Sequence, residues 1–152
     1  VCTPGQIQRY MNKISGPLLD RIDIQCEISP VPFKDISKAA PGEPSARIRE
    51  RVIRAREIQA ERFKDFKGIH CNAQMTERMI HQFAEPTEEG INLLRMAMEK
   101  LSLSARAYNR ILKVARTIAD LAGSQQIEPQ HLAEAIGYRT LDRGDWAERG
   151  HF

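Results

Sequence analysis

Cysteine is scarce in this sequence, and its few cysteines form no recognisable motif. There are three among 152 residues, and no two are separated by the two-residue spacing typical of zinc and redox motifs. The neighbouring His70 and Cys71 have no further His or Cys at ligand spacing. We therefore expect no disulfide framework, no metal site and a reducing, cytoplasmic environment.

Long apolar stretches are also missing. No run approaches the roughly 20 residues that a membrane-spanning helix needs, and the N-terminus lacks the charged-then-apolar pattern of a secretory signal. We expect no membrane partner. Because the chain begins at Val1 rather than at a methionine, we also expect it to be part of a longer protein.

Complete catalytic motifs are absent as well. No glycine precedes a Lys-Ser or Lys-Thr pair, so the sequence contains no phosphate-binding P-loop, and no apolar strand ends in paired acids suited to Mg²⁺. Neither a Gly-x-Ser-x-Gly elbow nor a His-Glu-x-x-His motif occurs. The net charge of +3 permits contact with nucleic acid but is too small to indicate it. This chain alone is expected to be catalytically inactive.

The strongest positive signal is an amphipathic helix between Ser104 and Gly123. Apolar residues recur on one arc at about 100° per residue, and cations occupy the opposite arc. These cations are Arg106, Arg110, Lys113 and Arg116. The hydroxyl of Ser104 is suited to cap the first turn, and Gly123 is suited to end the helix in the left-handed conformation. We therefore predict one face for a core and one cationic face.

Arg106 is out of place in this helix on energetic grounds. A cation in the first turn lies against the positive end of the helix dipole and loses about 0.3–1 kcal/mol. Two explanations are open at this level. The cations either form an ordinary solvated face, or Arg106 serves an anion such as phosphate.

Helical periodicity and capping signals extend over most of the chain and predict an all-α fold. A short helix starts at Thr3-Pro4, and a domain of about five helices covers residues 45–67, 76–83, 87–101, 104–123 and 128–136. The stripe expected to be buried in the first of these five comprises Ile48, Val52, Ala55, Gln59, Phe63 and Phe66. The residues expected to be buried in the third and fifth are Ile91, Leu94, Met98, Leu101, Leu132, Ala133 and Ile136, with His131 exposed.

The N-terminal part of the chain has a different pattern. Apolar and polar residues alternate over residues 22–28, which predicts a half-buried strand, but the chain offers this strand no partner. Four prolines within residues 30–44 then indicate a linker. We therefore divide the chain into a helix-strand remnant of a larger core (1–29), the linker (30–44), a helical domain (45–143) and a flexible tail (144–152).

Two groups of motifs resemble a known family. The first runs from Cys2-Thr-Pro-Gly-Gln to Pro17-Leu-Leu-Asp-Arg-Ile-Asp-Ile24, and the second comprises Leu103-Ser-Ala-Arg-Ala-Tyr-Asn-Arg-Ile-Leu-Lys and Glu134-Ala-Ile-Gly-Tyr-Arg. The chain resembles the C-terminal part of the magnesium-chelatase-like AAA+ ATPases of the competence-protein ComM group. In that family the first stretch ends the ATPase core, and the helices after the linker form the lid.

The resemblance implies roles for individual arginines. Arg21, in Leu-Leu-Asp-Arg-Ile-Asp, matches the arginine finger, which reaches the ATP held by a neighbouring subunit. Arg106, in Leu-Ser-Ala-Arg, matches the sensor-2 arginine, which would explain a cation where the helix dipole disfavours one. Arg110 is a further candidate for binding nucleotide, and Arg116 receives no role.

The resemblance also implies cofactors and partners. The parent protein is expected to be an ATPase that uses ATP and Mg²⁺, forms a homo-oligomeric ring, expected to be a hexamer, and remodels DNA. This fragment is expected to bind no cofactor tightly. The alternative is an independent nucleic-acid-binding module that uses the arginine-rich helix 45–67. Micromolar binding to duplex DNA near 0.15 M salt, with a steep salt dependence, would favour that alternative.

Overall fold

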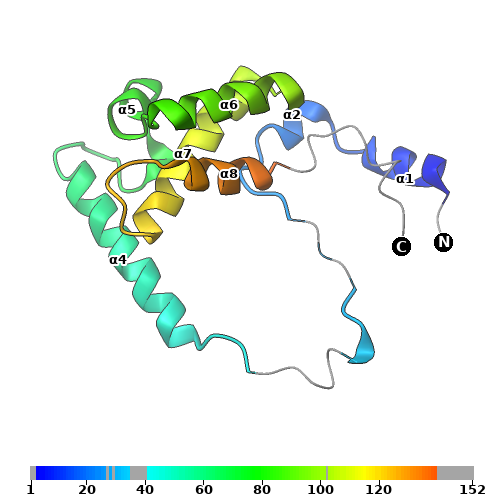
Figure 1. Ribbon diagram of the computed structural model, residues 1–152, viewed down its shortest axis with the longest axis horizontal. Helices are drawn as coiled ribbons and strands as arrows, with labels where there is room; N and C mark the ends of the chain where they lie inside the picture. Colours follow the sequence, from blue (N-terminus) through cyan, green and yellow to red (C-terminus); the bar gives the residue numbers. More distant parts are fainter. Residues whose placement is uncertain (1–2, 27, 29, 35–40, 102, 140–152) are drawn as a thin grey trace.

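A computed structural model describes residues 3–26, 28, 30–34, 41–101 and 103–139. Within these residues the chain is all-α and contains no strand, so the predicted fold class is confirmed (Figure 1). The helices are α1 (Pro4–Met11), α2 (Gly16–Leu19), α4 (Ser45–Phe63), α5 (Glu77–Phe83), α6 (Glu88–Leu101), α7 (Ala105–Leu121) and α8 (Pro129–Gly137), with a 3₁₀ turn, η1 (Asn72–Gln74).

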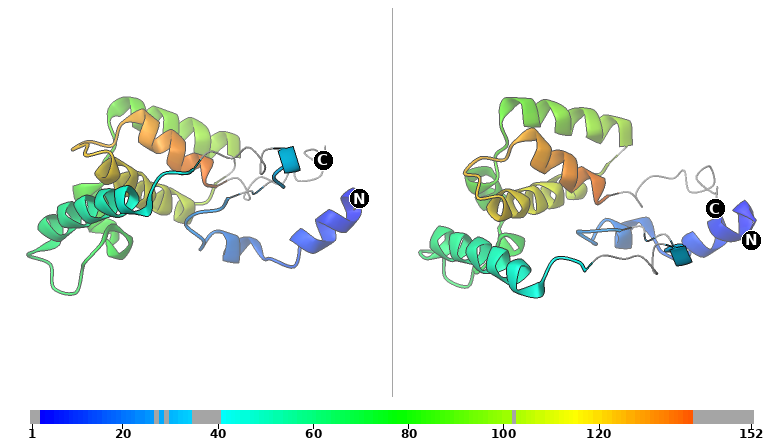
Figure 2. Two further views of the ribbon diagram at one scale, coloured as in Figure 1. Left: turned by 90° about the horizontal axis from the view of Figure 1, so that it is seen from below. Right: turned by 60° about the horizontal axis from the view of Figure 1, so that its bottom comes forward.

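Helix α7 is the centre of the helical domain. Both views in Figure 2 show the order α6, α8, α7 and α4 from one side of the domain to the other. Helix α7 contacts α4, α5, α8 and η1, and α6 packs on α8. The buried face of α7 is built mainly of small and aliphatic side chains, namely Ala107, Ile111, Leu112, Ala115 and Ala119. Small residues let the neighbouring helices approach α7 closely.

The predicted ends of α7 are confirmed. Ser104 Oγ accepts a hydrogen bond from the Ala107 N–H at 3.2 Å, which satisfies one free donor of the first turn. Gly123 has a φ of 70°, a conformation that glycine adopts without the strain a Cβ would cause. The position of α7, and therefore that of Arg106 in its first turn, was predictable from local sequence.

Helix α4 ends at Phe63 rather than extending to residue 67, and an aromatic cluster follows. The rings of Phe63, Phe66 and Phe83 meet edge to face, with centroids 5.7–6.5 Å apart. Phe63 is buried, as predicted, whereas Phe66 is only half-buried. This cluster joins the end of α4 to α5.

Several predictions of burial are wrong. Ile48 and Val52 are each 42% exposed, because the N-terminal half of α4 projects from the helical body (Figure 1) and no described residue covers it. Ile91 is 45% exposed, and on α8 Ala133 is exposed whereas Ala135 is buried. Periodicity identified the helices correctly but could not show where a covering partner is lacking.

His131 is also buried rather than exposed, at 5% exposure. Its Nδ1 accepts a hydrogen bond from the Glu128 N–H at 3.1 Å, immediately before α8. A histidine that binds the backbone at a helix start has its polar atom satisfied and can be covered at little cost.

The predicted strand is wrong for the described residues 22–26 and 28. Ile22 and Ile24 are exposed while Gln25 is buried, which is the reverse of the expected alternation. The Gln25 N–H donates to the Tyr138 carbonyl at 2.8 Å, just after α8. In the absence of a sheet partner, this segment satisfies backbone groups against the helical domain instead.

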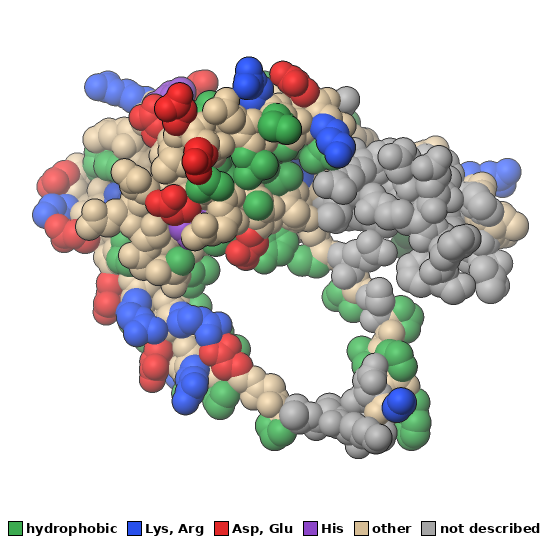
Figure 3. All heavy atoms as spheres, viewed as in Figure 1, with side chains coloured by type: hydrophobic (Ala, Val, Ile, Leu, Met, Phe, Trp, Pro, Cys, Tyr) green, Lys and Arg blue, Asp and Glu red, His purple; other side chains and the backbone are tan. Residues whose placement is uncertain are grey.

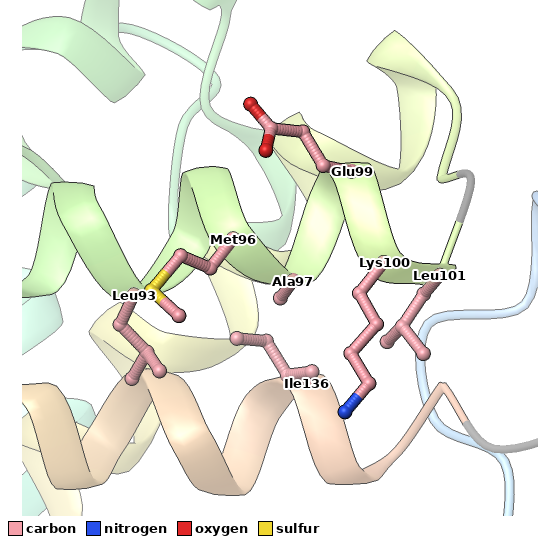
Figure 4. Close-up of a pocket in the computed structure, with 7 residues that line it drawn as sticks. All are labelled: Leu93, Met96, Ala97, Glu99, Lys100, Leu101 and Ile136. Carbon is pink, nitrogen blue, oxygen red and sulfur yellow. The ribbon is translucent and has the colours of Figure 1, made fainter.

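Helices α6 and α8 lie against each other at one end and leave a groove at the other. A Cβ placed on Gly90 would come within 2.7 Å of Leu132 Cδ1, so the helices nearly touch there. Toward their C-terminal ends a groove of about 630 Å³ opens between them. Figure 4 shows Leu93, Met96 and Ile136 lining it, with Glu99 turned away from α8.

Part of the predicted organisation falls outside the described residues. This applies to the tail 144–152, to residues 140–143 of the helical domain, and to residues 35–40 of the linker. The domain boundaries proposed from the sequence therefore stay predictions. Among the described helices, none has the length and apolar character needed to cross a membrane.

Candidate functional site

A hollow of about 330 Å³ lies between the turn after α2 and the first half of α7. Four cationic residues line it, namely Arg21, Arg106, Arg110 and Lys113. Two acidic residues, Asp23 and Glu77, line it as well. We call this feature the cationic hollow. The structure thus brings together all three arginines that the sequence marked as candidate site residues.

Arg106 contributes a cation that pairs with no acid of the described residues. It follows the N-cap Ser104 by two residues, is exposed, and forms no ion pair among the described residues. Its position in the first turn places it at the positive end of the α7 dipole. No acid of the described residues forms an ion pair with this guanidinium, so a bound anion would find it available.

Arg21 lines the same hollow from the turn that follows α2. The residue is exposed, and its Nη1 donates to the Pro17 carbonyl at 3.3 Å. The Pro17 carbonyl is an uncharged acceptor, and Arg21 forms no ion pair within the described residues. Its charge is therefore available as well.

Arg110 differs from the other two arginines because it is already paired. Its guanidinium donates to the Asp23 carboxylate, and both side chains are partly exposed, at 32% and 49%. An anion would have to compete with Asp23 for Arg110. The sequence offered Arg110 as a nucleotide-binding candidate, and the structure gives it a partner within the chain.

Lys113 is a member of the hollow whose role the sequence did not indicate. Its Nζ donates to the Ala73 carbonyl at 2.9 Å, which ties α7 to η1. Burial lowers the pKa of the Lys113 ammonium, nearby Asp23 opposes that shift, and Arg110 adds to it. Helical spacing from Arg106 and Arg110 was the signal that placed Lys113 on the same arc.

Arg116 is the clear departure from the predicted cationic face. It is 3% exposed, and each of its three guanidinium nitrogens donates a hydrogen bond inside the fold. Nε donates to Asp120 Oδ1 at 3.1 Å, Nη1 to the Gln125 carbonyl at 2.9 Å and Nη2 to the Ser124 carbonyl at 2.6 Å. Burial lowers the pKa of Arg116, and the Asp120 carboxylate opposes that shift. Arg116 is a structural residue and not part of the hollow.

Asp120 is the centre of this buried network. Its carboxylate also accepts two bonds from Arg62 of α4, at 2.7 and 2.5 Å, and one from Asn72 Nδ2 at 2.8 Å. The Asp120 side chain is fully buried, at 0% exposure. Two guanidiniums and one amide therefore compensate a single buried charge, and they join α4, η1 and α7.

The basic face of α4 is less suited to nucleic acid than its arginine count suggests. Arg62 is committed to Asp120, Arg51 pairs with Glu43, and Lys64 pairs with Glu61. Figure 3 shows basic and acidic side chains alternating along the projecting part of this helix. Interleaved charges of this kind are typical of a solvated face.

The described residues contain no group of three or more His, Cys, Asp or Glu side chains able to hold a metal ion. His70 is exposed and donates its backbone N–H to Gln74 Oε1 at 2.7 Å, and Cys71 Sγ lies 3.6 Å from the same oxygen. Both residues serve the η1 turn.

Sequence reasoning missed two residues that hold the Arg21 turn in place. Asp20 accepts a hydrogen bond from Ser104 Oγ at 3.0 Å, and buried Arg139 donates to the Ile22 carbonyl at 2.6 Å. Both residues lie inside the motifs that carry the family resemblance, Leu-Leu-Asp-Arg and Gly-Tyr-Arg. Their pairing required the tertiary structure.

Comparison with known proteins gives consistent matches. The family model described as magnesium chelatase, subunit ChlI C-terminal, matches residues 42–139, and that described as magnesium chelatase, subunit ChlI, matches residues 1–36. Competence protein ComM of Haemophilus influenzae is 45% identical over 142 residues, which are 93% of this chain and 27% of that protein.

Two further relatives carry the name uncharacterized protein YifB. The Escherichia coli protein is 45% identical and the Salmonella typhimurium protein 43% identical, each over 143 residues. Each alignment covers 93% of this chain and 27% of the relative. The chain therefore spans about a quarter of the length of these relatives.

Proposed function

This chain belongs to the magnesium chelatase ChlI C-terminal family, and on that premise we propose that it is the lid portion of a ring-forming AAA+ ATPase. The parent protein would couple ATP hydrolysis to remodelling of a macromolecule, with DNA as the candidate substrate. The match to an AAA+ ATPase-related family establishes the class of the fragment, and the ring, the nucleotide and the DNA are our proposal.

One observation carries the proposal. Arg21 and Arg106 come from segments far apart in the sequence, yet they line the same hollow. Each is exposed, and neither forms an ion pair within the described residues. Two available guanidiniums around one concave site are an arrangement suited to a polyphosphate.

The residues of the cationic hollow fit an ATP phosphate chain. The four cations exceed the two acids, and one acid, Asp23, is occupied by Arg110. Arg21 and Arg106 would hold phosphate oxygens, and Lys113 would add positive charge at the wall. ATP with Mg²⁺ supplies the phosphoryl group, and a planar guanidinium directed at its oxygens stabilises the charge that develops on them.

The position of Arg21 supports action on a neighbouring subunit. This chain contains no P-loop, and Arg21 lies at the surface of a turn rather than inside a core. We propose that Arg21 is the arginine finger, that Arg106 is the sensor-2 arginine, and that both act at the ATP site shared by adjacent subunits of a homo-oligomeric ring, with a hexamer as the proposed size. Arg110 would approach nucleotide only after exchanging Asp23 for phosphate.

DNA is the proposed substrate of the ring because one relative is named a competence protein. The chain itself supports this weakly, since its exposed arginines on α4 are interleaved with acids. We accordingly place DNA remodelling in the parent ring rather than in an independent module on α4.

The test is ATP turnover in the full-length parent carrying Arg21→Ala or Arg106→Ala. We expect each variant to lose roughly 10²-fold or more in turnover, as removal of a charge-stabilising arginine does. Arg95→Ala on α6 is the matched control, because Arg95 is an exposed arginine outside the hollow that bonds only Asn92 among the described residues. Wild-type turnover in both hollow variants would refute the proposal.

A further inference from the structure

The two residues that flank Arg21 are both fastened to the helical domain. On one side, Asp20 Oδ2 accepts a hydrogen bond from Ser104 Oγ at 3.0 Å, and Asp20 Oδ1 lies 3.7 Å from Arg139 Nη2. On the other side, the Ile22 carbonyl accepts from Arg139 Nη1 at 2.6 Å. We call these four residues, Asp20, Ile22, Ser104 and Arg139, the clamp. The backbone of Arg21 is therefore held from both directions.

Ser104 joins the clamp to the start of α7. The same hydroxyl accepts from the Ala107 N–H as the N-cap and donates its proton to Asp20. A serine hydroxyl can do both at once, because it has one donor and two acceptor lone pairs. The Ser104 hydroxyl thus links the residue before Arg21 to the helical turn that carries Arg106.

Arg139 joins the clamp to the end of α8. It is 1% exposed, although an arginine is rarely buried unless its charge is compensated. Its Nη1 donates to the Ile22 carbonyl, and its Nη2 faces Asp20 Oδ1 at 3.7 Å as an ion pair without a hydrogen bond. The adjacent Tyr138 carbonyl accepts from the Gln25 N–H at 2.8 Å. Burying a guanidinium against this turn fixes the turn more firmly than surface contacts would.

The side chain of Arg21 contrasts with its backbone. Its guanidinium is exposed and bonds the Pro17 carbonyl at 3.3 Å, a local contact within the same turn. The clamp therefore fixes the backbone position of Arg21 and leaves its guanidinium free to reach a ligand. A fixed backbone position matters because misplacing a catalytic group by about 1 Å can cost up to 10²-fold in rate.

We propose that Arg139 is a positioning residue for Arg21 and that it acts through Asp20 and Ile22. Together with Ser104, it makes the turn that carries Arg21 move with the ends of α7 and α8, so a shift of the lid displaces Arg21 and Arg106 together. This inference rests on the proposed function, in which Arg21 serves the ATP site of a neighbouring subunit.

The test is a double-mutant cycle in the full-length parent, with ATP turnover as the readout. Arg139→Met keeps an unbranched apolar side chain and removes the guanidinium. We expect it to lower kcat about 10-fold. In the Arg21→Ala background the same substitution should cost no further turnover, because the residue that it positions is already gone.

Arg116→Met is the matched control for a merely structural effect. Arg116 is also a buried arginine that donates to backbone carbonyls, and its partners Asp120, Ser124 and Gln125 lie outside residues 20–25. Arg116→Met should lower turnover by the same factor whether residue 21 is arginine or alanine. This control also shows that a further loss is measurable in the slow Arg21→Ala background.

Asp20→Asn is the second variant if Arg139→Met does not fold. It retains the shape of the side chain and an acceptor for Ser104, and it removes the charge that faces Arg139. The same non-additivity with Arg21→Ala is expected, together with faster hydrogen exchange at the Gln25 amide. The clamp would be overturned if Asp20→Asn left hydrogen exchange at the Gln25 amide unchanged and lowered turnover by the same factor with and without Arg21.

Different results would refute the proposed role of Arg21 and the positioning role of Arg139. If Arg21→Ala alone leaves turnover at the wild-type level, the proposed role of Arg21 falls and the clamp falls with it. If Arg21→Ala is slow but Arg139→Met multiplies that loss by its own factor, only the positioning role of Arg139 is overturned. Non-additivity confined to the clamp variants supports both.

Discussion

The two ends of helix α7 use arginine in opposite ways. At the N-terminal end, Arg106 is exposed, forms no ion pair among the described residues and lines a hollow. Near the C-terminal end, Arg116 is 3% exposed and donates to Asp120 and to two backbone carbonyls. One arginine has its charge available, and the other has its bonding capacity used within the fold.

The difference comes from what lies opposite each residue. Asp120 is one turn from Arg116, and α4 supplies Arg62 to the same carboxylate, so the C-terminal end of α7 is enclosed by a polar network. No acid of the described fold pairs with Arg106. A cation kept in an electrostatically unfavourable position without an ion-pair partner in the described fold is better suited to a ligand than to stability.

The largest effect on stability is expected from Asp120→Ala. Removing this carboxylate leaves Arg62 and Arg116 without their shared buried counter-charge, which should lower the free energy of unfolding by about 3–5 kcal/mol. Urea denaturation measures the loss. Asp23→Ala is the control, because its pair with Arg110 is partly exposed and should be worth at most about 1 kcal/mol. Equal losses in the two variants would contradict a structural role specific to the buried end.

A smaller loss is expected from Ser104→Ala at the other end of α7. Losing the N-cap should cost about 1 kcal/mol, and losing the bond to Asp20 should add to it. Thr76→Ala on α5 is the matched control, because Thr76 caps a helix through Met79 and has no second side-chain partner among the described residues. Thermal denaturation measures both losses of stability. A smaller loss in Ser104→Ala than in Thr76→Ala would contradict the link between α7 and residue 20.

The smallest effect, and one of opposite sign, is expected from Arg106→Ala. Removing a cation from the positive end of α7 should raise the free energy of unfolding by up to about 1 kcal/mol, because the unfavourable dipole interaction disappears. Arg116→Ala, measured in the same urea titration, should be strongly destabilising. Melting of the helical domain on Arg106→Ala would show that Arg106 is structural.

Local signals in the sequence were sufficient for the helices and for one site residue. The cap at Ser104, the left-handed Gly123 and the periodicity between them define α7, and they place Arg106 in its first turn. The family resemblance gave Arg106 and Arg21 separate roles, and the structure shows that they line one hollow. Helical spacing relates residues of one helix but carries no information on which distant segment packs beside it.

What the sequence could not give was the identity of the tertiary partners. Arg116 lies on the predicted cationic arc but is covered, because Arg62 of α4 converges on Asp120. His131 is covered because it binds the Glu128 backbone. The alternation from residue 22 is a strand pattern whose sheet partner is not in the described chain, so the segment binds Tyr138 and Arg139, just after α8, instead.

The most direct measurement mixes subunits of the full-length parent. One subunit carries Arg106→Ala or Arg21→Ala, and the other carries a substitution of the P-loop lysine and intact arginines. If Arg21 and Arg106 serve one shared ATP site between subunits, each mixture regains turnover above the sum of its separate components. Recovery with Arg21→Ala but not with Arg106→Ala would contradict this account, because the two arginines would then act at different sites.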